Sequence, residues 1–174
     1  FIQQNPDWDS KYKSDYHCID PAPPCDEDDV KKVKAIFLNP EETLFDRYRA
    51  MFKLRDINTT ESIKALCEGF NDKSALFRHE IAYVCGQLEN PVASKALEKA
   101  MINSDEHCMV RHEAAEALGT LADDEDVHKI LEDFKNCDER IVRESCQVAL
   151  DIAEFWNSDE IETAIDETAD ETPA

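Results

Sequence analysis

Apolar residues recur with helical spacing along the middle of the chain, and one such pattern occurs more than once. The segments 75–88 (ALFRHEIAYVCGQL) and 108–121 (CMVRHEAAEALGTL) align at an offset of 33 residues, with six of fourteen positions identical. Two weaker copies flank them, at 44–55 and 140–153. A repeat of this length with helical periodicity indicates a solenoid built from helix pairs.

An arginine marks each copy, and the rest of each unit can be placed from it. Arg47, Arg78, Arg111 and Arg143 are spaced 31, 33 and 32 residues apart. We expect the first helix of each unit to begin near its arginine, and the arginines to bridge one repeat to the next. The remaining apolar stripes predict helices over 30–38, 60–70, 91–102 and 124–134.

Small residues recur on the first helices of the two best-matched copies. Ala82 and Gly86 align with Ala115 and Gly119. A glycine inside a helix costs about 1 kcal/mol relative to alanine, so a packing reason is expected there. We therefore predict that these positions let neighbouring helices approach closely.

These patterns predict an all-α fold, a HEAT-like helical-hairpin repeat solenoid of about four repeats. The chain of 174 residues contains only three glycines, too few for the turns of an all-β protein. Four prolines lie in residues 1–27, which we interpret as a flexible linker or arm. Residues 28–156 form the repeat domain, and residues 157–174, with seven acids and no Lys or Arg, are expected to be a disordered acidic tail.

Charge and cysteine content narrow the possible partners and the compartment. The formal net charge of −21 argues against nucleic acid and against anionic membranes. It suits a basic protein partner or bound cations, although acidic residues also serve simply to keep a protein in solution. The seven cysteines show no C-x-x-C spacing, which favours free thiols in a cytoplasmic protein.

The candidate chemistry lies in two His-Glu pairs. His79-Glu80 and His112-Glu113 occupy the same slot of adjacent repeats. Equivalent helices of a solenoid lie about 10 Å apart, so these side chains can converge. Two imidazoles and a carboxylate form the ligand set of non-haem Fe(II) oxygenases, but zinc or manganese would also accept them. Alternatively, the pairs are surface residues inherited by duplication and bind no metal.

The motifs resemble one known family. The stretches ALFRHEIAYVCGQL, MVRHEAAEALGTL and VRESCQVALDIAEFW, together with DPAPP at 20–24 and RYRAMFKLR at 47–55, are similar to the C-terminal half of deoxyhypusine hydroxylases. That resemblance implies a non-haem di-iron monooxygenase of hypusine biosynthesis, whose two halves hold two Fe(2+) ions between them. It would use O2 to hydroxylate the deoxyhypusine side chain of a translation initiation factor.

Carried over by motif, the resemblance assigns roles to four residues. His79, His112 and Glu113 would be ligands of one iron, the one expected from this half. Glu80 would lie beside the site as the catalytic residue that engages the substrate amine or the metal.

The chain also departs from the family pattern. Two further His-Glu motifs are missing, and the neighbouring slots hold Tyr48-Arg49 and Glu144-Ser145, which we do not expect to act as ligands. Three explanations are open. The chain is a fragment of a longer protein, a partner chain supplies the missing N-terminal half, or the chain is inactive by itself. A non-catalytic HEAT-repeat interaction scaffold and a mononuclear metal site remain the alternatives.

Overall fold

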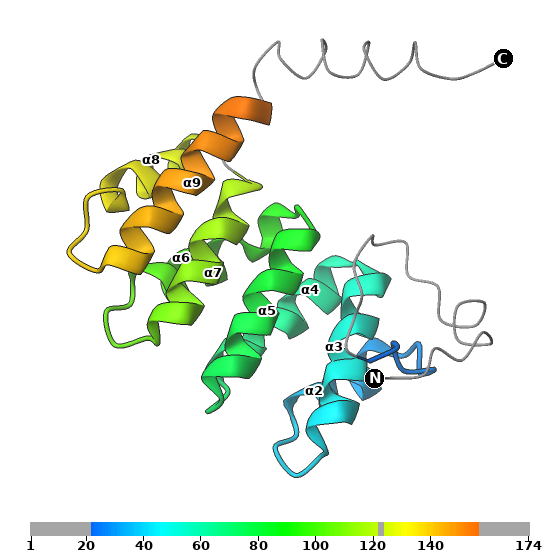
Figure 1. Ribbon diagram of the computed structural model, residues 1–174. Helices are drawn as coiled ribbons and strands as arrows, with labels where there is room; N and C mark the ends of the chain where they lie inside the picture. Colours follow the sequence, from blue (N-terminus) through cyan, green and yellow to red (C-terminus); the bar gives the residue numbers. More distant parts are fainter. Residues whose placement is uncertain (1–21, 122–123, 157–174) are drawn as a thin grey trace, which may run out of the picture.

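The computed structural model describes residues 22–121 and 124–156, and these are helical with no strand (Figure 1). The α-helices are α2 (Val30–Leu38), α3 (Leu44–Ile57), α4 (Thr60–Glu68), α5 (Ala75–Gln87), α6 (Ser94–Ile102), α7 (Cys108–Gly119), α8 (Glu125–Phe134) and α9 (Arg140–Trp156). Short 3-10 helices, η1 (Gly69–Asn71) and η2 (Pro91–Ala93), extend α4 and precede α6. The all-α repeat fold is confirmed, and the helix predicted over 30–38 coincides with α2.

Polar side chains begin the helices where the sequence pattern placed their starts. Ser74 accepts a hydrogen bond from the Phe77 amide at the start of α5, and Nδ1 of His107 accepts one from the Met109 amide at the start of α7. Asp124 caps α8 in the same way. Capping satisfies amides that have no partner within the helix, so each repeat begins at a defined residue.

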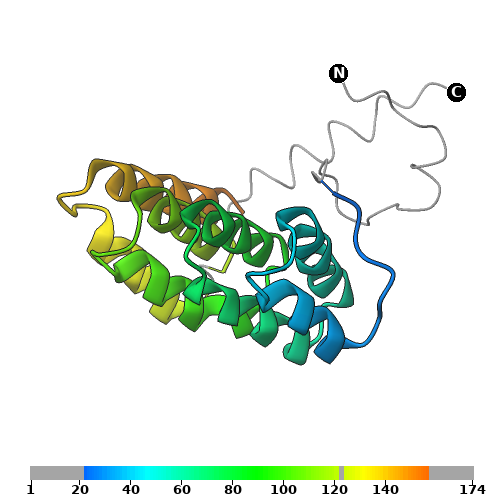
Figure 2. The ribbon, with the colours of Figure 1, turned by 90° about the horizontal axis from the view of Figure 1, so that it is seen from below.

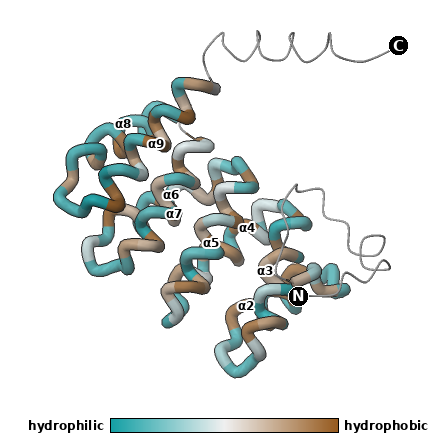
Figure 3. Tube along the Cα trace, viewed as in Figure 1, coloured by the Kyte–Doolittle hydropathy of each residue, from teal (hydrophilic) through white to brown (hydrophobic). Residues whose placement is uncertain are grey.

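The helices form two layers, which Figure 2 shows from the side. The first helices of the repeats, α3, α5, α7 and α9, stack next to one another, and α2, α4, α6 and α8 form the second layer. Apolar side chains from both layers make one continuous core. In Figure 3 apolar stretches run along the helices, and the loop between α2 and α3 is largely hydrophilic.

Glycines hold the first helices close together, as predicted. A Cβ atom on Gly86 would lie 3.1 Å from both the Cα and the Cβ of Ala117 on α7. A Cβ atom on Gly119 would lie 2.9 Å from the Cβ of Ala149 on α9. The same contact is therefore made at both joints, and it brings α5, α7 and α9 near enough for side chains to reach across.

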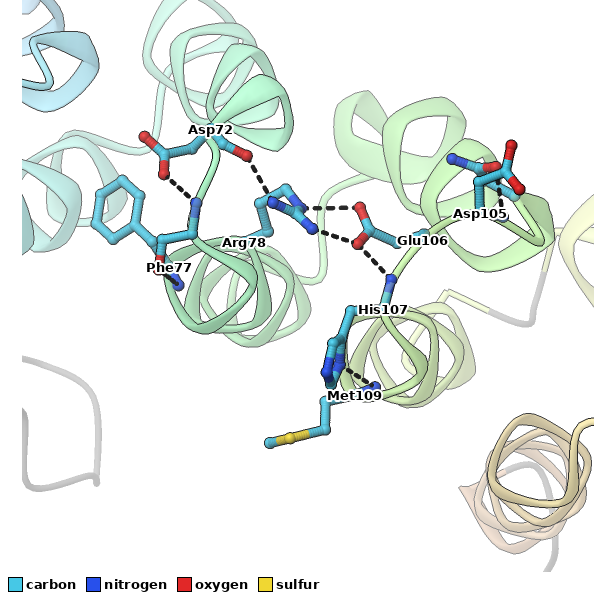
Figure 4. Close-up of polar contacts among 9 residues, drawn as sticks. Asp72, Phe77, Arg78, Asp105, Glu106, His107 and Met109 are labelled. Atoms are coloured by element: carbon cyan, nitrogen blue, oxygen red, sulfur yellow. Dashed lines mark hydrogen bonds and ion pairs between the residues drawn. The ribbon is translucent and has the colours of Figure 1, made fainter.

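The arginine of each repeat holds loops and helix ends together. Arg78 donates to the Asp72 carbonyl at 2.6 Å and, through Nε and Nη2, to both carboxylate oxygens of Glu106, in the loop before α7 (Figure 4). Arg47 donates to the Phe37 carbonyl and to the Asp72 carboxylate. Both arginines therefore join one repeat to the next.

The described part of the N-terminal segment packs against the first repeat. Arg49 donates to the carbonyls of Pro23 and Pro24 at 3.1 and 3.3 Å, and its own carbonyl accepts from the Cys25 amide at 3.2 Å. Ala22 is buried. The arm predicted over 1–27 lies partly, and the acidic tail predicted over 157–174 wholly, outside the described residues, so both stay predictions.

Two further observations bear on compartment and membrane. Within the described ranges six cysteines are free thiols: Cys25, Cys67, Cys85, Cys108, Cys137 and Cys146. In the same ranges no helix combines the length and the apolar character that crossing a bilayer requires.

Candidate metal centre

The two His-Glu pairs lie on adjacent helices, one turn after each helix begins. His79 and Glu80 are on α5, and His112 and Glu113 are on α7. The Gly86–Ala117 contact near the other end of these helices sets their close spacing. All four side chains are partly buried.

Glu113 is the residue that joins the two repeats. Its Oε2 lies 3.1 Å from Nε2 of His79, on the neighbouring helix, and 3.9 Å from Nε2 of His112. The structure therefore brings three of the four predicted site residues together around one carboxylate oxygen. Glu80 stands to one side, with Oε1 3.7 Å from Nδ1 of His79.

Burial changes the acidity of this central carboxylate. The Glu113 side chain is only 12% exposed, and its pKa is raised to about 7, first by burial and then by the charges of Glu116 and Glu80. Near neutral pH the carboxyl group is therefore only partly ionised. A cation bound there would replace the proton and relieve the repulsion among the acids.

One pair of donor atoms in the cluster has the spacing of two ligands on a divalent metal ion, and the third donor lies farther away. Two ligands in adjacent positions, each roughly 2.1 Å from a first-row ion, lie about 3 Å apart. The distance between His79 Nε2 and Glu113 Oε2 matches this, and the distance from His112 is wider. Nδ1 of His79 is buried without a hydrogen-bond partner, although buried polar atoms are nearly always paired. That nitrogen is not the one that faces Glu113, which is Nε2.

Two contacts behind His112 were not predicted from the sequence. Its Nδ1 lies 2.7 Å from the hydroxyl of Ser145 on α9 and 3.4 Å from Oε1 of Glu116. Ser145 occupies the slot of Glu80 and Glu113 in the last repeat, so register could have indicated it. Glu116 is four residues after His112 and therefore on the same helix face.

Glu116 also creates a second possible cation position. One donor atom each from His112, Glu113 and Glu116 lie within 4.8 Å of one another. This group shares two residues with the predicted set but replaces His79 by Glu116. Oε1 of Glu116 lies 3.4 Å from Nδ1 of His112, and Oε2 of Glu113 lies 3.9 Å from its Nε2, so the two acids approach different nitrogens of the ring.

At the other end of the row, the first repeat places Tyr48 where its neighbours carry histidine. The Tyr48 ring packs on Phe52 and Phe77. Its pKa is raised to about 12 by burial and then by the charge of Glu80, so the phenol keeps its proton at neutral pH. Arg49, in the glutamate slot, is engaged with the arm.

The remaining histidines have ordinary surroundings where the structure describes them. His107 is an exposed helix cap, and His128 is exposed on α8. His17 lies outside the described residues. Among the described histidines, the convergence therefore involves the two that share a register.

Known proteins resemble this chain in both sequence and fold. The family of HEAT repeats matches residues 63–151, and the PBS lyase HEAT-like repeat matches residues 46–72. The chain is 53% identical over 156 residues to a deoxyhypusine hydroxylase of Candida albicans, a match that covers 87% of this chain and 49% of that protein. It is 49% identical over 150 residues to one of Drosophila melanogaster, covering 86% and 49%.

The fold comparison agrees with the sequence comparison. A solved structure of human deoxyhypusine hydroxylase in complex with glycerol matches with a TM-score of 0.79 and 43% identity, covering 86% of this chain and 53% of that one. The chain thus spans about half the length of the relatives it matches. The repeats, the stacking of the helices and these matches lead to one conclusion. The chain belongs to the HEAT-repeat family and, within it, resembles the deoxyhypusine hydroxylases.

Proposed function

We propose that this chain is the C-terminal, metal-binding half of a deoxyhypusine monooxygenase. The observation that carries the proposal is the convergence of His79 and His112 on Glu113 across two repeats, in a chain about half identical to proteins of that name. In the metal site His79, His112 and Glu113 would be the protein ligands of one Fe(2+), of two in the complete enzyme. When bound, iron supplies the activation of dioxygen that side chains alone cannot perform.

The residues around the ligands suit a substrate with a long, cationic side chain. Glu80 lies beside the cluster and is partly exposed, so its carboxylate can hold an ammonium group next to the site. Leu76 and Met109, each three residues before a histidine, are 55% and 44% exposed. They share a helix face with His79 and His112 and offer apolar surface for methylene groups.

Partners follow from the same proposal. The protein substrate would be a deoxyhypusine-containing translation initiation factor, drawn toward the acidic surface of a chain with net charge −21. The ligands of the second iron would come from an N-terminal half carrying two further His-Glu motifs. We place this chemistry in the cytoplasm, where the free cysteines would stay reduced.

Reconstitution tests the proposal. The chain is mixed with the complementary half of one of the relatives, Fe(2+), dioxygen, a reductant and a peptide containing deoxyhypusine. We expect the peptide to gain the mass of one oxygen atom, and we expect the mixture to retain iron on desalting. The variant His79→Ala/His112→Ala should lose the product and the iron held by this half, while the iron held by the complementary half remains. His128→Ala, which removes an exposed histidine, should lose neither product nor iron. Absence of product and of bound iron in the unmodified mixture would leave a non-catalytic HEAT-repeat scaffold as the function.

A further inference from the structure

The last repeat contributes one side chain to the cluster, and its hydrogen-bonding geometry has a chemical consequence. Ser145 on α9 is 4% exposed. Its hydroxyl oxygen lies 2.7 Å from the Ile141 carbonyl oxygen and 2.7 Å from Nδ1 of His112. A hydroxyl has one hydrogen to donate and lone pairs to accept with, so the roles of the two contacts can be assigned.

The Ile141 carbonyl can only accept, so the Ser145 hydroxyl donates to it. The serine oxygen then presents a lone pair to His112, and Nδ1 of His112 must carry a hydrogen. Glu116 Oε1, 3.4 Å from the same nitrogen, is a second acceptor and favours the same assignment. With its hydrogen on Nδ1, a neutral imidazole keeps the lone pair of Nε2 free. That nitrogen is the one nearer Glu113.

We propose that Ser145 is a positioning residue that holds His112 in the Nδ1–H tautomer, with Nε2 directed at the metal position. The inference rests on the proposed function for its purpose, but the tautomer is a property of the metal-free chain. A free histidine side chain favours its hydrogen on Nε2, which would block the ligand atom. Groups behind a histidine ligand commonly fix its tautomer and orientation in this way.

His79 provides the contrast within the same cluster. Its Nδ1 has no hydrogen-bond partner, whereas Nδ1 of His112 has two acceptors nearby. The two histidines are therefore held differently. His112 is fixed from behind by a hydrogen bond to the last repeat, whereas the nearest acid to Nδ1 of His79, Glu80, is 3.7 Å away and makes no hydrogen bond with it.

The tautomer can be measured directly by NMR on the full chain labelled with 15N-histidine and free of metal. The spectra are recorded about two pH units above the ordinary imidazole pKa of roughly 6.5, so that imidazoles are neutral. We expect His112 of the parent chain to carry its hydrogen on Nδ1. Ser145→Ala and Ser145→Cys should shift it toward Nε2, and Ser145→Thr, which keeps a hydroxyl, should restore the parent signal.

The affinity for Co(2+) provides a second readout. We expect Ser145→Ala to weaken binding about 10- to 100-fold, the usual cost of removing a group that orients a metal ligand. Ser94→Ala is the matched control, because Ser94 is also a buried helical serine but its hydroxyl has no partner. It should change neither readout.

Two results would overturn the inference. One is an unchanged His112 tautomer in both Ser145→Ala and Ser145→Cys. The other is a tautomer that shifts in Glu116→Gln instead, which would make Glu116 the anchor. Failure of the parent chain to bind Co(2+) would count against the proposed function, whereas the tautomer would still be decided by the metal-free spectra.

Discussion

The two middle repeats and the two outer repeats share one register, but the residues in equivalent slots make different contacts. In the middle, the slots after the arginine hold His79-Glu80 and His112-Glu113, and these converge across the gap between α5 and α7. In the first repeat the second of these slots holds Arg49, which binds the N-terminal arm. In the last it holds Ser145, which contacts His112.

The difference shows how a solenoid builds a site. Each repeat contacts only its neighbours, so a cluster between two repeats is supported only by those two and the ones beside them. Tyr48 lies on one side and Ser145 on the other, and both side chains are directed at the middle pair or the core next to it. The outer repeats lack the His-Glu pairs, but their side chains pack beside the helices that carry them.

The arginine slot is structural in every repeat, but its partners differ along the row. Arg47 and Arg78 each pair with an acid, whereas Arg111 and Arg143 donate to backbone carbonyls. Arg78 forms a two-pronged ion pair with Glu106, while Arg143 in the last repeat donates, among the described residues, to the carbonyls of Cys137 and Asp138. We expect Arg78→Ala to cost about 3 kcal/mol of unfolding free energy, because it leaves Glu106, 11% exposed, without its partner. Arg143→Ala should cost about 1 kcal/mol.

Urea unfolding of both variants measures this difference. Equal losses at the two positions would contradict the view that the middle joint depends on a partly buried charge pair.

The raised pKa of Glu113 predicts a pH effect confined to the middle repeats. The folded chain holds this proton more tightly than the unfolded chain, since its pKa is about 7 rather than 4.5. In the metal-free chain, this carboxyl group therefore makes its full contribution to the free energy of unfolding below pH 4.5. That contribution is lost as the pH rises through about 7. Glu113→Gln should be more stable than the parent above pH 7 by on the order of 2 kcal/mol, and similar to it in acid.

Thermal unfolding over a pH series checks the sign. Glu116→Gln should show part of the stability gain expected for Glu113→Gln above pH 7, because the charge of Glu116 is the second cause of the raised pKa of Glu113. A Glu113→Gln variant that is less stable than the parent above pH 7 would refute the assignment.

The close contacts at Gly86 and Gly119 are similar in the two joints, and alanine substitution can show which of them is tighter. A Cβ atom added at Gly119 would lie 2.9 Å from the Cβ and 3.0 Å from the Cα of Ala149. A Cβ atom added at Gly86 would lie no closer than 3.1 Å to any atom of Ala117. Alanine gains about 1 kcal/mol in helix propensity, which offsets part of the overlap. We expect Gly119→Ala to lose about 1 kcal/mol and Gly86→Ala to be nearly neutral. Calorimetric melting would show the ranking, and a reversed order would be inconsistent with the close spacing of α5, α7 and α9.

The smallest effect is expected at the first repeat. Arg49→Ala removes the donors to the carbonyls of Pro23 and Pro24 but leaves the backbone bond from the Cys25 amide. We expect a loss of about 0.5 kcal/mol in stability and faster hydrogen exchange at the Cys25 amide. Exchange that is unchanged there would mean that the arm is held by Ala22 and its apolar contacts instead.

Much of this architecture could be predicted because it repeats. The 33-residue offset placed the helices, the arginine bridges and the Gly86 and Gly119 contacts, since a repeated fold imposes the same packing demand at each joint. It also placed the histidines side by side. These predictions needed only register and helical periodicity.

The parts that could not be predicted depend on side-chain direction rather than register. The repeat pattern does not specify which glutamate joins the two repeats, because that depends on side-chain rotamers. Only the family resemblance distinguished Glu113 from Glu80. Register identifies the slot of Ser145, but its contact with His112 could not be predicted, because a serine differs in type from the glutamates in the same slot of the middle repeats. Glu116 lies outside the repeated motif and is a neighbour of His112 only in space.

The proposed function requires that His79, His112 and Glu113 hold one divalent cation between the middle repeats. Anomalous diffraction from crystals of the chain soaked in Co(2+) would locate that cation. We expect a cobalt peak next to Nε2 of both histidines and a carboxylate oxygen of Glu113. A peak on the Nδ1 edge of His112 beside Glu116, or no peak at the cluster at all, would show that these three residues do not form the metal site.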